Sequence, residues 1–181
     1  DNTIELNNSY SLNHYLGEEL CRFYSDNKKI NIVCARPSNV FGVPEINLLS
    51  RAYLVPMCFV KEALFFNKIT LRSSGKQVRN FVSTDSIADQ TIRLIKSFPF
   101  GFNLINMGSK YNASILEIAN LVKKIGMQKH NLNIDLNIES DYPLESNNFK
   151  YLSNYQNSFE ERETTLKKME EIIINLFKKF K

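Results

Sequence analysis

The sequence has few of the residues that mark metal sites, disulfide scaffolds or membrane spans. Its three cysteines, Cys21, Cys34 and Cys58, are odd in number, have no CxxC spacing and stand among apolar neighbours, so we expect reduced, buried thiols and no metal site. No apolar run approaches the roughly 20 residues of a membrane-spanning helix, and the first residues do not resemble a secretion signal. We therefore expect a cytoplasmic protein without a membrane partner.

An excess of charge of one sign is also absent. Among 181 residues, 23 are Lys or Arg and 19 are Asp or Glu, which gives a net charge of +4. Much of the excess lies in "LKK" and "LFKKFK" near the end, a pattern typical of a solvated helix face, so we expect no nucleic-acid partner. With 43% hydrophobic residues, 13 Phe and 8 Tyr, the chain has enough apolar side chains to form a folded core.

Helical and strand-like segments alternate along the chain, which favours an α/β architecture with a mostly parallel sheet. Asn8 or Ser9 can cap a first helix that ends near Asn27. Its apolar positions recur at helical spacing: Leu12, Leu16, Leu20 and Phe23. "INIVCA", residues 30–35, is an apolar run typical of a central strand that is covered on both faces. Residues 36–45 are expected to form the loop after it, at the end of the strand where ligands bind in open α/β sheets.

The rest of the chain continues the alternation. We expect a helix within 53–67, two short strands within 69–83, a helix from Thr84 or Asp85, and a strand at 102–108. Ser114 and Glu117 form the pattern of a capping box for the next helix, which Gly126 is expected to end. An alternating strand follows, and a last helix from about residue 160 carries an apolar stripe: Leu166, Met169, Ile173, and Leu176 or Phe177.

Tyr10 and His14 are candidates for chemistry at the start of the first helix. They are four residues apart, so their side chains share one face. Gly17 falls on the same side one turn later, at a cost of roughly 1 kcal/mol relative to Ala, which suggests close approach of a neighbouring element or a ligand. A tyrosine serves acid/base catalysis only if its pKa falls from about 10 towards neutrality, and a nearby cation lowers it most directly. Taken alone, the pair is better explained as a cap residue and a surface histidine.

A series of motifs in chain order changes that interpretation. "YSLNHYLGEEL", a strand, "RPSNVFG", "GKQVRNFVSTDSIADQTI" and "FNLINMGSKYNASILEIANLV" follow one another between about residue 5 and residue 126. Together they resemble the carboxyl-terminal half of the nucleotide-sugar epimerase/dehydratase family, the extended short-chain dehydrogenase/reductases. The resemblance implies the carboxyl-terminal part of a Rossmann-type doubly wound parallel sheet, plus a small mixed α/β substrate-binding subdomain.

The resemblance also implies roles in the first helix. Tyr10 matches the catalytic tyrosine, which exchanges a proton with a sugar hydroxyl while hydride passes to or from NAD or NADP, and Glu18 matches a glutamate with a structural role. His14 stands where the family has a lysine that binds the nicotinamide ribose and lowers the tyrosine pKa. Because histidine is neutral near pH 7 unless its pKa is raised, we expect a functional but retuned site, with Tyr10 and His14 serving catalysis and cofactor binding. Pro37 is assigned to cofactor binding.

Substrate contacts follow from the same resemblance. Asn39 matches the asparagine that reaches the substrate phosphate or sugar, and Arg79 matches the arginine that contacts the diphosphate, a role suited to the planar donor fork of guanidinium. A plain loop asparagine and a surface arginine are the alternatives. Two residues of the following loop are assigned to the nucleotide pocket: Asn47 and Leu48. Gly42, which lets the backbone turn, and Asp85, which can cap the next helix, are assigned structural roles.

The cofactor half of the family's fold is not recognisable. The 6 glycines, at positions 17, 42, 75, 101, 108 and 126, form no glycine-rich turn of the kind that seats a pyrophosphate on a helix. We therefore expect the amino-terminal dinucleotide-binding half to be missing, which would leave apolar surface exposed. Residues 1–45 and 78–108 are assigned to the Rossmann-type domain, and residues 46–77 and 109–181 to the substrate-binding subdomain.

Two functional hypotheses remain. The first is the carboxyl-terminal fragment of an NAD(P)-dependent nucleotide-sugar epimerase, dehydratase or reductase, inactive by itself and homodimeric through the Tyr10 helix as the full-length protein. The second is a diverged, non-catalytic module that binds a nucleotide sugar or a protein, in which His14 records lost redox chemistry. Tyr10, Asn39 and Arg79 together favour the first hypothesis, whereas His14 favours the second.

Overall fold

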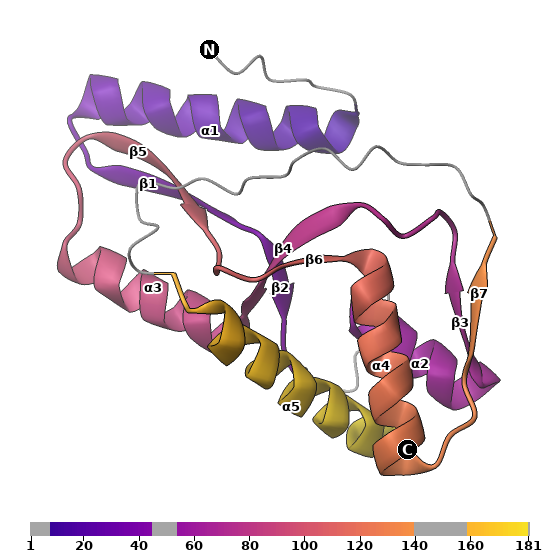
Figure 1. Cartoon of the computed structure of the whole chain (residues 1–181). Helices are drawn as coiled ribbons and strands as arrows, with labels where there is room; N and C mark the ends of the chain where they lie inside the picture. Colours follow the sequence, from indigo (N-terminus) through magenta and orange to yellow (C-terminus); the bar gives the residue numbers. More distant parts are fainter. Residues whose placement is uncertain (1–7, 45–53, 140–158, 181) are drawn as a thin grey trace.

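The structure, a computed structural model, describes residues 8–44, 54–139 and 159–180. In chain order its elements are α1 (Ser9–Lys28), β1 (Ile32–Pro37), β2 (Asn39–Phe41), α2 (Met57–Phe66), β3 (Lys68–Leu71), β4 (Val78–Ser83), α3 (Thr84–Lys96), β5 (Phe102–Met107), β6 (Asn112–Ser114), α4 (Ile115–His130), β7 (Asp135–Ile138) and α5 (Arg162–Phe180). Figure 1 shows α1, β1, β5 and α3 together at one side and α2, α4, β3 and β7 at the other. The fold is mixed α/β with parallel strand pairs, as the sequence predicts.

β1 and β5 pair in parallel along their whole length, from Ile32 opposite Phe102 to Pro37 opposite Met107. α1 lies over one face of this pair and α3 over the other (Figure 1). On the α3 side, Leu94 packs with β5 side chains in a small apolar cluster. A helix therefore lies on each face of β1, as predicted, but the cover is incomplete, since Ala35 and Pro37 are exposed and no residue of β1 is fully buried. The second strand neighbour expected of a central strand is not found among the described residues, where β1 pairs with β5 alone.

β2, β4 and β6 form a second sheet, which the sequence predicts only in part. β1 extends to Pro37, and β2 pairs in parallel with β4, with Asn39 opposite Phe81. The expected loop at 36–45 is thus partly strand. β6 adds an antiparallel neighbour on the other side of β4. These short pairings place the polar residues of β2 and β4 side by side, immediately beyond the end of β1.

α4 begins as predicted and ends later. Ser114 is its N-cap, and the capping box with Glu117 is formed. The helix does not end at Gly126 but continues to His130. A Cβ atom added at Gly126 would lie 2.4 Å from Ile134 Cδ1, so this glycine is needed for close packing rather than for a helix end.

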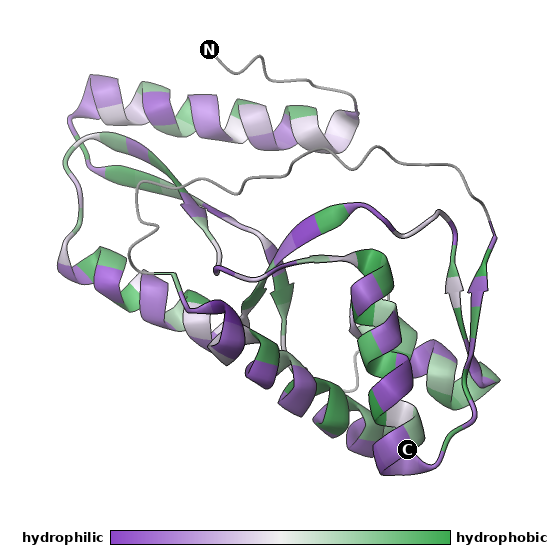
Figure 2. Ribbon diagram, viewed as in Figure 1, coloured by the Kyte–Doolittle hydropathy of each residue, from purple (hydrophilic) through white to green (hydrophobic). Residues whose placement is uncertain are grey.

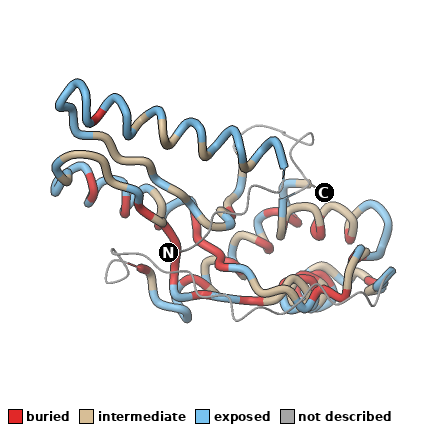
Figure 3. The backbone as a smooth tube through the Cα atoms, turned by 90° about the horizontal axis from the view of Figure 1, so that it is seen from above, coloured by how far each residue is buried: buried red, intermediate tan, exposed pale blue. Residues whose placement is uncertain are grey.

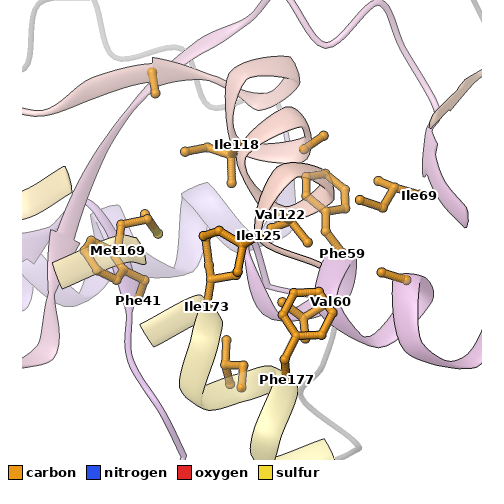
Figure 4. Packing of buried hydrophobic residues seen from close by; sticks show 14 of the residues in the cluster. Phe41, Phe59, Val60, Ile69, Ile118, Val122, Ile125, Met169, Ile173 and Phe177 are labelled. Atoms are coloured by element: carbon orange, nitrogen blue, oxygen red, sulfur yellow. The ribbon is translucent and has the colours of Figure 1, made fainter. Parts of the chain in front are cut away.

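The larger apolar core lies where α2, α4 and α5 meet (Figure 4). The predicted stripe of α5 is buried in it, since four of its side chains have no exposed surface: Met169, Ile173, Leu176 and Phe177. Val60 from α2 and Val122 from α4 are equally buried. This core packs against β4. It therefore supports the strands that carry the candidate substrate residues.

The apolar stripe of α1 faces away from its own sheet. Exposed fractions run from 41% to 59% over its four members, Leu12, Leu16, Leu20 and Phe23. Hydrophobic and hydrophilic residues alternate along this helix in Figure 2, and Figure 3 shows it exposed over most of its length. Exposed apolar surface is therefore present, as expected. The close approach of a neighbouring element predicted at Gly17 is wrong for the described residues, because nothing lies within 4 Å of a Cβ added there, and the alternative, a ligand, stays a prediction.

Candidate functional site

A surface hollow of about 520 Å³ lies between the first turns of α1 and the end of β1. α1 contributes Tyr10, His14 and Glu18 to its wall, and β1 contributes Arg36 and Pro37. The start of α1 is set by its N-cap, Asn8, whose side-chain oxygen accepts a hydrogen bond of 2.8 Å from Ser11 N. The structure thus brings together the three residues that the sequence assigns to the cofactor: Tyr10, His14 and Pro37.

The rings of Tyr10 and His14 are in edge contact, with centroids 4.4 Å apart and planes inclined at 60°. Tyr10 is 73% exposed. Within the part of the chain that the structure describes, neither side chain has a hydrogen bond or an ion pair. The phenol hydroxyl and the imidazole nitrogens are therefore available to a ligand in the hollow.

Glu18 and Arg36 join the two walls of the hollow. Arg36 Nε donates to Glu18 Oε1 at 2.6 Å, and Arg36 Nη2 donates to the second carboxylate oxygen. The Glu18 side chain is only 16% exposed, so water screens this bidentate pair less than a fully exposed one. Glu18 was predicted to have a structural role, and its partner is Arg36. The pair holds the helix that carries Tyr10 against the strand that ends at Pro37.

Asn39 and Arg79 lie beyond this hollow, on the adjacent strands β2 and β4. Asn39 Nδ2 donates to the backbone carbonyl of Asn80 at 3.0 Å, which leaves its side-chain oxygen and a second N–H available. Arg79 is exposed and donates to the neighbouring carbonyl of Val78 at 3.1 Å. Among the described residues it has no acidic partner, so most of its donors are uncommitted.

Two structural assignments need correction, and two residues cannot be placed. Gly42 does not have a left-handed backbone; a Cβ added there would lie 2.7 Å from Thr84 Cγ2, so the glycine is required by the close approach of α3 and not by a turn. Asp85 is not the cap of α3. That cap is Ser83, whose Oγ accepts from Ser86 N at 3.1 Å, while Asp85 stands in the first turn, where a carboxylate is favourable. Two predicted residues lie outside the described ranges: Asn47 and Leu48.

Sequence reasoning missed a buried polar side chain of β4 that bonds to the turn after β5. Asn80 is 1% exposed and hydrogen-bonds to both the N–H and the carbonyl of Ser109. Nearby, Gln90 Nε2 donates to the carbonyl of Gly108 at 2.9 Å. The available signal was an asparagine directly before the apolar pair Phe81 and Val82 of the strand "VRNFVS", because a buried amide of this kind needs specific partners.

The cysteines are not arranged for reactivity. All three are free. Burial raises the pKa of the Cys58 thiol to about 12, and burial together with a hydrogen bond to the Cys21 thiol raises the pKa of Cys34 to about 11. In the described ranges there is no cluster of three or more His, Cys, Asp or Glu residues that could hold a metal ion. None of the helices described there combines the length and apolar content needed to cross a bilayer.

Comparison with known families and sequences gives consistent results. The model of the NAD dependent epimerase/dehydratase family matches residues 1–108. GDP-L-fucose synthase of Sinorhizobium fredii is 27% identical over 123 residues, which cover 66% of this chain and 39% of that protein. dTDP-D-glucose 4,6-dehydratase of Dictyostelium discoideum is 24% identical over 120 residues, which cover 66% of this chain and 26% of that protein. The matched residues therefore span well under half the length of these relatives.

Solved structures extend the likeness to nearly the whole chain. UDP-N-acetylglucosamine 4-epimerase from Methanobrevibacter ruminantium, in complex with UDP-N-acetylmuramic acid, matches with a TM-score of 0.74 at 20% identity, over 99% of this chain and 58% of that one. An NAD dependent NDP-hexosamine 5,6-dehydratase involved in tunicamycin biosynthesis matches with a TM-score of 0.75 at 17% identity, over 98% and 56% respectively. At such identities the likeness shows the fold, which is the Rossmann-like fold of epimerases and dehydratases.

Proposed function

Since the chain belongs to the NAD dependent epimerase/dehydratase family, we propose that it is the part of an NAD(P)-dependent nucleotide-sugar epimerase or dehydratase that carries the catalytic tyrosine, Tyr10. The proteins similar to it in sequence and fold are nucleotide-sugar epimerases and dehydratases. The observation that carries the proposal is the hollow in which Tyr10, His14 and Pro37 meet.

The lining of the hollow fits the nicotinamide end of a dinucleotide. The polar ends of Tyr10 and His14 have no partner among the described residues, and both can hydrogen-bond a ribose hydroxyl. When bound, the nicotinamide supplies hydride transfer to or from the sugar. The pyrophosphate has no comparable site here, because the 6 glycines do not form a phosphate-binding turn. The fit is therefore to one end of NAD or NADP.

Each polar residue has a role in this proposal. Tyr10 Oη takes up the proton of the sugar hydroxyl that is oxidised and returns it when the sugar is reduced. His14 hydrogen-bonds the ribose and, in its protonated form, stabilises negative charge on Tyr10. The Glu18–Arg36 pair keeps α1 against β1, so that both side chains stay at the hollow.

The substrate lies towards β2 and β4. Arg79 binds the diphosphate, since its guanidinium has uncommitted donors and no acidic partner in the described chain. Asn39 offers a free side-chain oxygen to a sugar hydroxyl or a second N–H to a phosphate. Two further residues, outside the described ranges, are proposed for the nucleotide pocket: Asn47 and Leu48.

The dinucleotide-binding half belongs, in this proposal, to a longer protein. Support comes from coverage, because the chain matches only 58% of a similar solved structure and 39% of a similar sequence. Residues 1–45 and 78–108 then belong to the Rossmann-type domain, and residues 46–77 and 109–181 to the substrate side. The 181-residue chain by itself is expected to be inactive.

The full-length protein is proposed to be a homodimer that uses α1. The exposed stripe of Leu12, Leu16, Leu20 and Phe23 is continuous over three turns and points away from the sheet that α1 covers. A second copy of the same stripe would bury these side chains in a two-fold contact.

A second candidate function rests on one observation, the presence of His14 instead of a residue that is always charged. The chain would then be part of a non-catalytic module that binds a nucleotide sugar or a protein. To separate the two, the intact protein is titrated with UDP-, GDP-, dTDP- and CDP-sugars while heat of binding, nicotinamide absorbance and sugar products are recorded. Conversion of one sugar supports the enzyme, whereas binding without conversion or absorbance change supports the module.

A further inference from the structure

Asn80 is a buried amide between the two sheets that carry the proposed cofactor and substrate residues. It stands in the middle of β4 and is 1% exposed. A buried amide is costly unless its polar atoms are hydrogen-bonded. The side-chain bonds of Asn80 all go to one segment, the turn after β5 and the start of β6.

The bonding pattern requires an amide. Asn80 Nδ2 donates to Ser109 O at 2.7 Å and to Asn112 Oδ1 at 2.8 Å, and Asn80 Oδ1 accepts from Ser109 N at 3.2 Å. An ionised aspartate has the same shape but no hydrogen to donate. It would place a negative charge against two oxygen acceptors in a buried position, so only asparagine satisfies the site.

The turn that Asn80 holds is connected to the wall of the hollow through the pairing of β5 with β1. It follows the last residue of β5, Met107, which lies opposite Pro37 in the parallel ladder. The carbonyl of Met107 also accepts a hydrogen bond of 2.9 Å from Ser38 N. Because Pro37 lines the hollow, a short backbone path joins Asn80 to the place where Tyr10 stands.

On its other side, Asn80 holds the strand that carries the proposed substrate contacts. Its backbone carbonyl accepts from Asn39 Nδ2 at 3.0 Å, and Arg79 is its neighbour in β4. Asn80 therefore contacts both β2 and the turn after β5. Displacement at Asn80 would move Asn39 and Arg79 relative to the hollow.

We propose that Asn80 is a positioning residue that keeps Asn39 and Arg79 in register with the hollow that contains Tyr10. The proposal rests on the proposed function, in which Arg79 holds the diphosphate while the sugar reaches Tyr10. A misplacement of about 1 Å between such groups is sufficient to lower a rate on the order of a hundredfold.

The first test measures the physical link without reference to activity. Amide hydrogen exchange of Ser38 is compared in the 181-residue chain and its Asn80→Asp and Asn80→Ser variants. Asn80→Ser introduces no charge and serves if Asn80→Asp does not fold. Val122→Ala is the matched control, because Val122 is fully buried in the core of α2, α4 and α5 and takes part in none of the hydrogen bonds of the Asn80 side chain. We expect faster exchange at Ser38 in the Asn80 variants and no change at Ser38 in the control.

The second test measures the consequence in the intact protein, with the nucleotide sugar that the wild type converts. We expect Asn80→Ser to lower kcat by about tenfold to a hundredfold while the KM for the sugar changes by less than about threefold. Val122→Ala, assayed well below its unfolding temperature, is expected to keep the wild-type kcat. This split separates positioning from a general loss of stability.

Each result decides the matter. Unchanged exchange at Ser38 in the Asn80 variants overturns the proposal, whatever the activity. An equal loss of kcat in Asn80→Ser and Val122→Ala also overturns it, since stability alone would then explain the effect. If the wild type converts no nucleotide sugar, the proposed function fails, and exchange at Ser38 still decides whether Asn80 links the two sheets.

Discussion

Replacing His14 with lysine tests how Tyr10 is activated. In the proposed reaction, Tyr10 must be ionised before it can take up the proton of the sugar hydroxyl, and a neighbouring cation stabilises that tyrosinate. Lysine is cationic over the whole neutral range, whereas histidine changes its charge between about pH 5 and 8. A His14→Lys variant of the intact protein should therefore be faster than the wild type where the imidazole is neutral.

The geometry sets the size of this effect. The Tyr10 and His14 rings are 4.4 Å apart between centroids, so the added charge acts over about that distance. Two unit charges about 4 Å apart interact by about 1 kcal/mol in water and by about 4 kcal/mol at an effective dielectric constant of about 20. Tyr10 is 73% exposed in the described chain, so the lower figure applies. About 1 kcal/mol corresponds to roughly a fivefold increase in kcat.

The sign follows from the charge. Lysine places a full positive charge beside Tyr10, so the variant should exceed the wild-type kcat by up to roughly fivefold at neutral pH. His14→Gln is the matched control, because it keeps a hydrogen-bonding group and carries no charge. It should be no faster than the wild type. Equal rates for all three proteins would refute the role of His14.

Other predictions follow from particular contacts. Gly17→Ala should raise the free energy of unfolding by about 0.5–1 kcal/mol, because the helix gains propensity and nothing lies within 4 Å of the new Cβ. Gly126→Ala should lower it by about 1 kcal/mol or more, because its Cβ would lie 2.4 Å from another side chain; urea unfolding measures both, and equal signs would contradict the packing argument. Leu20→Ser should weaken dimerisation of the intact protein by about thirtyfold, since Leu20 is 56% exposed and each copy loses about 1 kcal/mol of burial; analytical ultracentrifugation would show an unchanged Kd if α1 is not the interface. Cys58, whose pKa is raised to about 12, should resist alkylation at mildly alkaline pH until the chain is unfolded, and rapid labelling of the folded chain would contradict its burial.

Helix starts were predictable because their signals are local. Asn8 caps α1, and Ser114 with Glu117 forms the capping box of α4, both as expected. In each case the hydrogen-bonding partners lie within three residues of one another, so a short stretch of sequence contains the whole interaction. The start of α1 matters for the proposed function, because it places Tyr10 and His14 at the hollow.

The direction in which α1 packs was not predictable from its periodicity. A stripe of leucines shows that a helix has an apolar face but does not identify its partner. In the structure α1 meets its own sheet through less apolar residues, including Glu18 and Ser25, and turns its leucines away. No residue in the described ranges covers this apolar stripe. In the proposed dimer, the second copy would cover it.

The residues that the sequence analysis missed or misassigned depend on distant partners. Asn80 bonds to Ser109, which is 29 positions away, and Gly42 is required by Thr84, which is distant in sequence and follows the neighbouring strand. Such contacts leave only a weak signal in the sequence, such as an amide beside apolar strand residues or a glycine without an obvious turn. The meeting of Tyr10, His14 and Pro37 at one hollow was anticipated through resemblance to a family, while the roles of Asn39 and Arg79 stay predictions.

The role of Tyr10 is tested most directly by comparing the intact protein with its Tyr10→Phe variant on the nucleotide sugar that it converts. Phenylalanine keeps the ring and its contact with His14 but cannot carry the proton. We predict that kcat falls by about 10²–10⁴-fold, the usual contribution of a general acid/base, while the Kd of the nucleotide sugar is unchanged. Equal kcat in the two proteins would contradict the account, because the hollow beside α1 would then not be the site of reaction.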